Sequence, residues 1–348
     1  MIFLNSEPAR KLVIETLNNA GHVEEGSKHV ADSLISTSLR GVDSHGLNLF
    51  PHYIRALAAK RVNASPKFKI VKTAESVIQF DADHAFGHYC GAKAMQEAIL
   101  TARKTGVGIA SVRNSTHFGA AAYFGLMAAE NGLIGLAFTN ADALVKVHGS
   151  KEPFFGTNPI CFTAPLANEG PFCLDMATSR IAWNKVVLYR KSKKVLEKDW
   201  AYNKEGEMVL SPDEASTLNP IGDYKGYGLG FVIDILCGIL AEGPVGKEIL
   251  PMYRAPIEAR RKIGHFFAAI NIEAFTGIQN FKTRMQGIVD QLRHLQPISS
   301  SNPVLVAGDP EKHSEEKRKI NGIPMEDEMF QEFLQINQKF QSAVLRHE

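Results

Sequence analysis

Residues 107–139 read VGIASVRNSTHFGAAAYFGLMAAENGLIGLAFT, and this stretch decides the fold class. Residues 107–112 and 133–139 are short apolar runs typical of buried strands, whereas residues 119–131 have the composition of a helix. A strand, a helix and a second strand in succession are typical of proteins in which helices cover a sheet. The sequence therefore predicts an α/β fold with a mixed, three-layer arrangement.

The segments on either side extend this pattern. Apolar residues at helical spacing predict three helices within the first sixty residues, the second of which stops at Gly41. After them we expect strands at 69–72, 76–80, 154–165, 172–176, 265–271 and 303–307, and helices at 91–105, 225–240, 276–295 and 327–345. Residues 191–211 are polar and predict an exposed, irregular excursion, and a charged segment spans residues 309–319.

Composition excludes several classes of protein. The chain has 348 residues, of which 45% are hydrophobic and 22% charged, and its formal net charge is +2. This balance predicts a globular core and argues against a nucleic-acid-binding surface. The four cysteines form neither a CxxC motif nor a zinc-type cluster, so we expect reduced thiols and no metal. We find no signal peptide and no apolar run long enough to span a bilayer, so we expect a cytoplasmic protein.

The candidate for chemistry nearest the N-terminus is His45, in the stretch LRGVDSHG at residues 39–46. A glycine-flanked loop after a helix can present a side chain to a ligand, and histidine exchanges its proton near neutral pH. A surface or capping histidine would give the same local pattern. A catalytic role for His45 is favoured by three further candidates in the chain, His117, Asp175 and Lys225.

His117 and Asp175 both lie where predicted strands end. His117 belongs to NSTHFG, between a strand and a helix, where α/β proteins bind ligands. Asp175 follows the apolar strand at 172–174, and a carboxylate there can orient an imidazole and stabilise its cation. The alternative for both is helix capping, for which Asn, Ser, Thr and Asp are ordinary residues.

Other polar positions allow both a binding role and a structural role. Lys225 and Gly226 place a cation at the start of a helix, which is a plausible anion site. Thr178 and Ser179 offer hydroxyls and amides to a phosphate. Asn158 lies in a GTNP turn and can equally be structural. The GxG at residues 106–108 lacks a third glycine and leads into a strand, so it is not a dinucleotide-binding fingerprint.

Taken in order, several segments resemble the type-2 malate/L-lactate dehydrogenase family. These segments are LRGVDSHG, NSTHFGAAAYFG, FFGTNPICF, LDMATS, WAYNKEG and YKGYGLG, and the likeness continues through HFFAAINIEAF and VAGDPE. The resemblance implies a non-Rossmann fold that binds NAD or NADP through a mixed sheet. It also implies a homodimer with its site near the subunit interface, a small-molecule substrate, and a helical N-terminal unit that packs on the C-terminal helices. We expect units at residues 1–65, 66–310 and 311–348.

The resemblance also assigns roles to residues. It implies that His45 is the acid/base for the substrate oxygen, that Asp175 holds its imidazole, and that His117 lines the same site and carries the proton in some members. The residues expected to hold the dinucleotide are Asn140, Asp175, Met176, Ala177, Thr178, Ser179, Lys225, Gly226, Gly308 and Asp309. The residues expected near the substrate are Ser44, Asn48 and Asn158.

One departure concerns the substrate. The family usually has DSHG, then two further residues, then an arginine that is expected to bind the substrate carboxylate, but here the position of that arginine is Leu49. Asn48 and Arg55 are candidates to compensate. Three hypotheses follow: an oxidoreductase acting on a small 2-oxo or 2-hydroxy acid, a reductase of C=N bonds with the same fold, and a silent nucleotide-binding relative.

Overall fold

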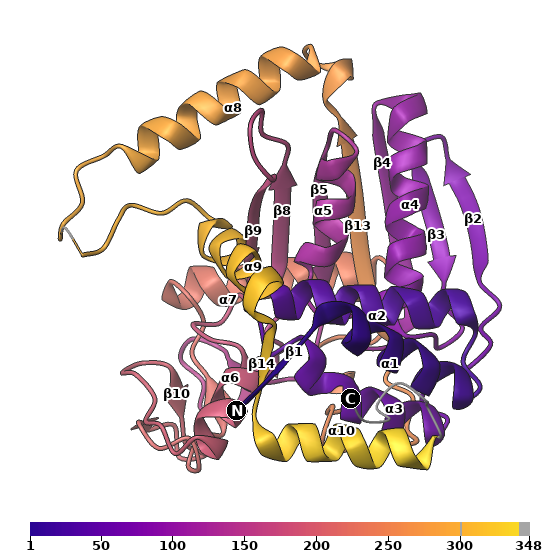
Figure 1. Cartoon of the computed structure of the whole chain (residues 1–348), viewed down its shortest axis with the longest axis vertical. Helices are drawn as coiled ribbons and strands as arrows, with labels where there is room; N and C mark the ends of the chain where they lie inside the picture. Colours follow the sequence, from indigo (N-terminus) through magenta and orange to yellow (C-terminus); the bar gives the residue numbers. More distant parts are fainter. Residues whose placement is uncertain (300, 341–348) are drawn as a thin grey trace.

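A seven-stranded sheet forms the centre of the chain, in the order β2-β3-β4-β13-β5-β8-β9 (Figure 1). The computed structural model describes residues 1–299 and 301–340. The strands are β2 (Lys69–Ala74), β3 (Val77–Asp81), β4 (Val107–Ser115), β13 (Ile263–Asn271), β5 (Leu133–Thr139), β8 (Ile160–Ala164) and β9 (Phe172–Met176). Strands β3 and β4 run parallel, whereas the other neighbouring pairs are antiparallel. The predicted mixed α/β class is confirmed.

Strand β13 lies between β4 and β5 and runs antiparallel to both. Ile263, the first residue of β13, pairs with Ser115, the last residue of β4. His265 pairs with Thr139, the last residue of β5. The loops that follow β4 and β5 therefore meet the loop that precedes β13 at a single edge of the sheet.

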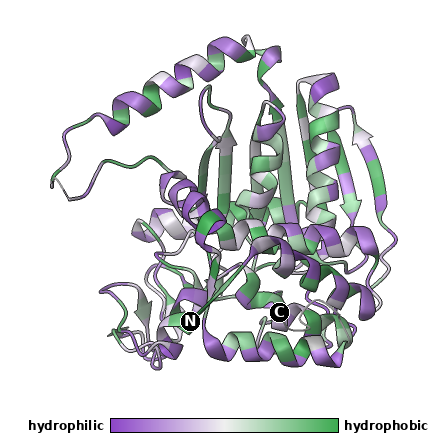
Figure 2. Cartoon of the chain, viewed as in Figure 1, coloured by the Kyte–Doolittle hydropathy of each residue, from purple (hydrophilic) through white to green (hydrophobic). Residues whose placement is uncertain are grey.

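Helices cover both faces of this sheet. Helices α4 (Gly87–Thr105) and α5 (Ala122–Glu130) lie on one face, and α7 (Asp223–Asp234) with a π-helical turn at Ile235–Ile239 lies on the other. Helix α4 approaches closely because small residues face the sheet: a Cβ on Gly108 would lie 2.0 Å from the Ala98 carbonyl oxygen. Figure 2 shows hydrophobic residues concentrated in the central strands.

A second apolar core joins the two ends of the chain. Helices α1 (Ser6–Asn19), α2 (Glu24–Leu39) and α3 (Phe50–Ala58), with a 3-10 turn at Leu47–Leu49, pack against α10 (Asp327–Lys339). Strand β1 (Ile2–Leu4) pairs with β14 (Ile323–Met325). The rings of Phe50 and Phe333 meet with centroids 5.4 Å apart. This arrangement confirms that the N-terminal helices pack with the C-terminal ones (Figure 1).

The prediction that residues 191–211 form an irregular exposed excursion holds for most of this segment, but residues within it also form two short strands. They contribute to a small sheet, in the order β11-β10-β12-β6-β7, that packs beside α6 (Trp183–Lys191). Its strands are β6 (Val145–Lys146), β7 (Pro153–Phe155), β10 (Ala201–Tyr202), β11 (Met208–Val209) and β12 (Thr217–Leu218). Leu196, Trp200 and Val209 are buried in its core. Apolar residues this widely spaced give no period, which hid the core from pattern reasoning.

The C-terminal part also differs from expectation. Residues 303–307 do not form the predicted strand. They run irregularly beside β9, where the backbone N–H of Cys173 donates to the Ala307 carbonyl at 3.5 Å. The charged segment is helix α9 (Asp309–Asn321), which follows α8 (Ile278–Arg293). Figure 1 shows α8 extending away from the body of the molecule. Residues 341–345 of the last predicted helix lie outside the described residues. Within the described chain, no helix has the length and apolarity to cross a membrane.

We predict that Phe267→Ala lowers the free energy of unfolding by about 3–5 kcal/mol, because it leaves a cavity in the centre of the sheet. Phe267 is fully buried in β13, with its ring centroid 5.2 Å from that of Phe124. Phe275→Ala is the matched control, since that ring is 73% exposed. Chemical denaturation followed by circular dichroism measures both changes, and equal effects would contradict the assigned core.

Candidate functional site

The His45 loop is fixed from both sides. Arg318 of α9 donates to Asp43 with both terminal nitrogens, at 2.5 and 2.9 Å, and also to the Ser38 carbonyl at 2.6 Å. Gly46 lies against Ser38, where a Cβ would come within 2.1 Å of the hydroxyl oxygen. The loop is therefore tied to α2 and to α9 at once, which holds His45 in a defined position.

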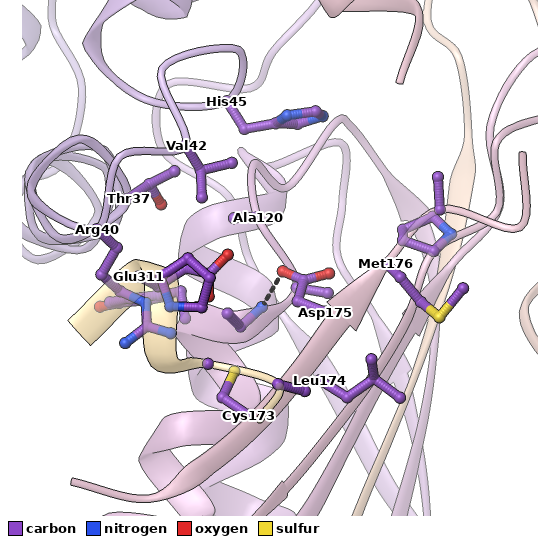
Figure 3. Close-up of a pocket in the computed structure, with 18 of the residues that line it drawn as sticks. Thr37, Arg40, Val42, His45, Ala120, Cys173, Leu174, Asp175, Met176 and Glu311 are labelled. Carbon is purple, nitrogen blue, oxygen red and sulfur yellow. Dashed lines mark hydrogen bonds between the residues drawn. The ribbon is translucent and has the colours of Figure 1, made fainter. Parts of the chain in front are cut away.

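His45 lies on the wall of a cavity of about 460 Å³. Figure 3 shows Asp175 extending into this cavity, with His45 above it and Arg40 and Glu311 on another side. The wall combines the loop after α2, the small residues 119–122 at the start of α5, the end of β9, and residues 305–311. Four of the predicted site residues, Ser44, Met176, Ala177 and Gly308, also line it.

A second cavity of about 120 Å³ lies on the other side of His45. It is lined by residues of the loops that meet at the sheet edge, namely His117, Ala141, Asp142, Ala143, Leu144 and Arg261, and by Thr157, Ala182, Trp183, Asn184 and residues 251–254. Among the described residues, His45 is the titratable side chain shared by both cavities. The structure thus brings His45 and His117 to the wall of the same cavity.

The two histidine rings stack with centroids 5.8 Å apart. The Nδ1 atom of His117 lies 2.7 Å from the Tyr53 hydroxyl and accepts the Gly119 N–H at 3.4 Å. Because a backbone N–H can only donate, Nδ1 is the acceptor and the ring proton of neutral His117 is on Nε2. Burial raises the pKa of Tyr53 well above its ordinary value, so its hydroxyl keeps its proton.

The electrostatics favour the neutral form of both rings. Burial lowers the pKa of His45 to about 4, and its Nδ1 lies 2.9 Å from the Ser44 hydroxyl. Burial, followed by the nearby His45, lowers the pKa of His117 well below its ordinary value. A charged ring here would lose hydration without gaining a described partner, which is why the neutral forms prevail.

Asp175 faces the larger cavity at the end of β9. Its Oδ2 accepts the Ala122 backbone N–H at 2.7 Å, and burial raises its pKa to about 6. No hydrogen bond joins Asp175 to His45 within the described structure; His45 is bonded to Ser44 instead. The carboxylate therefore lies on the same cavity wall as the imidazole it was predicted to hold, with a different hydrogen-bond partner.

Several predicted binding residues use their side chains within the protein. Asn140 donates to the Pro244 carbonyl and accepts from Gly264. Asn158 accepts from Ala141 and donates to Gly230 and Asp234, as the structural alternative for this residue requires. Thr178 and Ser179 donate to the carbonyls of Thr157 and Ile181. All four are buried behind the wall of the cavities rather than on it.

The predicted binding residues Lys225, Gly226 and Asp309 are not on the wall of either cavity. Lys225 is exposed on α7, and Gly226 allows close packing, since a Cβ there would lie 1.4 Å from the Ile221 carbonyl oxygen. Asp309 is buried and pairs with Arg293. Neither Asn48 nor Leu49 is on the wall of either cavity.

Sequence reasoning missed four residues of the site. Arg40, buried on the larger cavity, belongs to the LRGVDSHG motif but received no role. Tyr53 lies among the buried apolar residues of α3, so its sequence pattern indicates only a core position. Asp142 and Arg261 form a buried ion pair on the smaller cavity. One sequence signal could have identified Arg261: it lies next to a predicted buried strand, where a cation is poorly solvated and therefore needs a partner.

The larger cavity suits a dinucleotide by its donor set. Arg40 is 8% exposed and, although it pairs with Glu315 at 3.7 Å, offers N–H donors to phosphates, whereas Asp175 offers a carboxylate to hydroxyl or amide groups. The small residues 119–122 leave space beside β9. The described residues contain no group of three or more His, Cys, Asp or Glu side chains placed to hold a metal ion.

Comparisons with known proteins match this geometry. The sequence profile described as malate/L-lactate dehydrogenase matches residues 4–334. Malate dehydrogenase of Pyrococcus abyssi is 38% identical over 93% of this chain and 91% of its own length. Ureidoglycolate dehydrogenase (NAD(+)) of Escherichia coli O157:H7 is 30% identical, covering 94% of both. (2R)-3-sulfolactate dehydrogenase (NADP(+)) of Chromohalobacter salexigens is 29% identical over 81% of this chain and 86% of its own.

Two solved structures extend the comparison. Malate dehydrogenase from Entamoeba histolytica superposes with a TM-score of 0.94 at 29% identity, covering 98% of this chain and 99% of the other. Delta1-piperideine-2-carboxylate reductase from Pseudomonas syringae pvar. tomato superposes with a TM-score of 0.87 at 25% identity, covering 97% and 100%. Each likeness spans both cavities and both helical ends of the chain.

We predict that the His45 ring of the cofactor-free protein titrates well below pH 6.5, with a pKa near the value of about 4 set by burial. Between these pH values the unfolded chain binds more protons at this position than the folded chain. The folded state therefore loses stability as the pH falls from 6.5 to 4. Histidine-selective isotope labelling and NMR titration measure the pKa, and His45→Asn assigns the resonance. A midpoint at the ordinary value would contradict the burial of this ring.

Proposed function

Because the chain belongs to the malate/L-lactate dehydrogenase family, we propose that it transfers a hydride between NAD(P) and C2 of a small 2-oxo or 2-hydroxy acid, with His45 as acid/base. Family membership makes the chain an NAD- or NADP-dependent dehydrogenase acting on CH–OH groups. What we propose beyond family membership is the class of substrate and the role of each site residue.

One observation carries the proposal: His45 lies on the wall of both cavities. The larger cavity has the donor set for a dinucleotide, and the smaller one has room for a small acid. A reaction between the two ligands must occur where the cavities adjoin. His45 is the group there that can exchange a proton.

The chain's own residues handle the proton. When bound, the nicotinamide supplies or accepts the hydride. In the reducing direction, His45 gives a proton to the substrate oxygen as the C2 carbonyl becomes a hydroxyl, and in the oxidising direction it takes that proton back. An anionic substrate raises the pKa of the adjacent His45 imidazole, which offsets the lowering caused by burial. The carboxylate of Asp175, on the wall of the same cavity, stabilises the His45 imidazolium.

His117 orients the substrate. Its Nδ1 is occupied by Tyr53 and Gly119, so its Nε2–H is left to donate a hydrogen bond. A donor of this kind polarises a carbonyl oxygen without leaving a charge behind. Ser44 holds the His45 ring in place through Nδ1.

The dinucleotide contacts follow from the cavity wall. Arg40, the stretch 175–177 and Gly308 line it and are proposed to touch the cofactor. Asn140, Thr178, Ser179 and Asp309 shape the wall from behind it. We keep the three units at residues 1–65, 66–310 and 311–348 as part of the proposal: the first carries His45, the second contributes most of both cavity walls, and the third secures the His45 loop.

A homodimer is also proposed. Helix α7 and the π-helical turn expose large apolar side chains, namely Leu229, Phe231, Val232, Ile235, Ile239 and Leu240, each at least 40% exposed. A contiguous apolar surface of this kind on a folded chain usually marks an interface. Lys225 and Gly226 begin the same helix, so a partner docked there would lie next to these predicted cofactor residues.

A reductase of C=N bonds is the second candidate, favoured by the similarity to delta1-piperideine-2-carboxylate reductase. The same proton donor would serve it, with the proton placed on nitrogen instead of oxygen. Turnover of a 2-oxo acid only in the presence of an amine would distinguish this candidate.

We predict that His45→Ala lowers kcat for any accepted 2-oxo acid by about 10²–10⁴-fold, because it removes the proton donor. Loss of nicotinamide absorbance measures turnover, and NADH or NADPH fluorescence measures cofactor binding, which should persist. His313→Ala is the control, since that histidine is exposed on α9. Unchanged turnover in His45→Ala would remove the acid/base assignment; cofactor binding without turnover of any 2-oxo acid or imine would support a silent relative.

The wild-type chain is predicted to elute at twice its 38.3 kDa mass in light-scattering chromatography. Phe231→Glu should shift it toward the monomer, because a charge would be buried in the interface. Val195→Glu, at a residue 73% exposed far from α7, should leave the mass unchanged. A monomeric wild type would rule out the homodimer.

A further inference from the structure

A buried arginine on the wall of the smaller cavity keeps one donor free. Arg261 lies two residues before β13, and its side chain is 2% exposed. Its Nε donates to the Leu250 carbonyl at 2.7 Å, and its Nη2 donates to the Asp142 carboxylate. Among the described residues its Nη1 has no hydrogen-bond partner, and that atom is not sealed from the cavity.

A second guanidinium lies directly behind it. Arg61 is 2% exposed and donates to the carbonyls of Met252 and Pro256, at 3.1 and 2.8 Å, so its charge has no carboxylate partner at hydrogen-bonding distance. The two guanidinium groups share the wall of a small void with Tyr53 and His117. Burial, followed by the charge of Arg261, lowers the pKa of Arg61.

The local charges do not balance. Two buried cations, Arg61 and Arg261, face one buried carboxylate, Asp142, and the other carboxylate that acts on Arg61, Glu258, is exposed to solvent, which weakens its charge. The neighbouring rings of His45 and His117 are neutral near pH 7 because burial lowers their pKa values. A buried positive charge without a counter-charge is unfavourable, and an anion in the cavity would relieve it.

Among the described residues that line the smaller cavity, Arg254 is the one other cation. Leu49 occupies the position at which the resemblance expects an arginine, and its side chain is buried in the apolar core of the N-terminal helices. Arg55 is turned to the exterior, where it pairs with Glu332 at 2.5 Å. Arg254 reaches the cavity only at its exposed rim.

We propose that Arg261 binds the carboxylate of the substrate through its free Nη1, with Asp142 as the positioning residue that holds the guanidinium in place. This rests on the proposed function, since it assigns the anionic end of the same 2-oxo acid. The substrate is held with its carboxylate at Arg261 and its C2 oxygen toward His45 and His117. A neutral ketone or aldehyde of the same size is therefore a poor substrate.

The test uses the full chain and two variants. Arg261→Met alone would leave Asp142 buried and unpaired, so the double variant Asp142→Leu/Arg261→Met, which removes both charges, is made beside it. Arg260→Met is the control, because Arg260 is exposed next to Arg261 in the sequence. The probe is oxalate, an unreactive anion, titrated calorimetrically into protein with and without NADH. The KM and kcat for 2-oxo acids and the Kd of NADH are measured in parallel.

We expect the Kd of oxalate and the KM of the 2-oxo acid to rise by about 10- to 150-fold in both Arg261 variants, the range expected for one hydrogen bond to a charged group. The Kd of NADH should stay unchanged, which also shows that each variant has folded. Retained oxalate affinity in the double variant would overturn the proposal. If wild type binds oxalate through Arg261 but turns over no 2-oxo acid, the anion site stands and the proposed reaction fails.

Discussion

The direction of β13 decides where chemistry can occur in this chain. An antiparallel strand between β4 and β5 aligns its own beginning with their ends. His117 follows β4, Asp142 follows β5 and Arg261 precedes β13, so three residues far apart in sequence share one cavity. Had β13 been parallel to its neighbours, Arg261 would lie at the opposite edge of the sheet.

Desolvation gives the residues at this edge their properties. The same burial that keeps His45 and His117 uncharged makes an unpaired guanidinium unfavourable. The smaller cavity is thus lined by more cationic than anionic side chains, and an anion would complement them. Asp175 follows the opposite course, because burial raises its pKa toward the range in which it exchanges protons. Binding of ligands, rather than the protein alone, completes the electrostatics.

Much of the fold could be predicted from sequence, because strands such as residues 133–139 and helices such as α1 carry a strong local pattern. The loop position of His45 and of His117 marked each as a candidate, but only the family resemblance implied that they share one site. The small sheet around Trp200 could not, since its core residues are scattered along a polar segment. Arg261 was equally hidden: within the run Arg260, Arg261, Lys262, one buried cation looks like its exposed neighbours. Only long-range pairing distinguishes them.

The segment between α8 and α9 closes a loop without any covalent link. Arg293 binds both Glu169 and Asp309, and Lys312 joins the same cluster through Glu169. Cross-linking the ends of a loop this long restricts the unfolded chain, and a disulfide would do so by about 3 kcal/mol. Here ion pairs hold the two ends together in the folded chain; they break on unfolding and so, unlike a disulfide, leave the unfolded chain unrestricted, and all four cysteines are free thiols. The rim of the larger cavity is consequently insensitive to reductants but sensitive to ionic strength, since salt screens such partly exposed pairs.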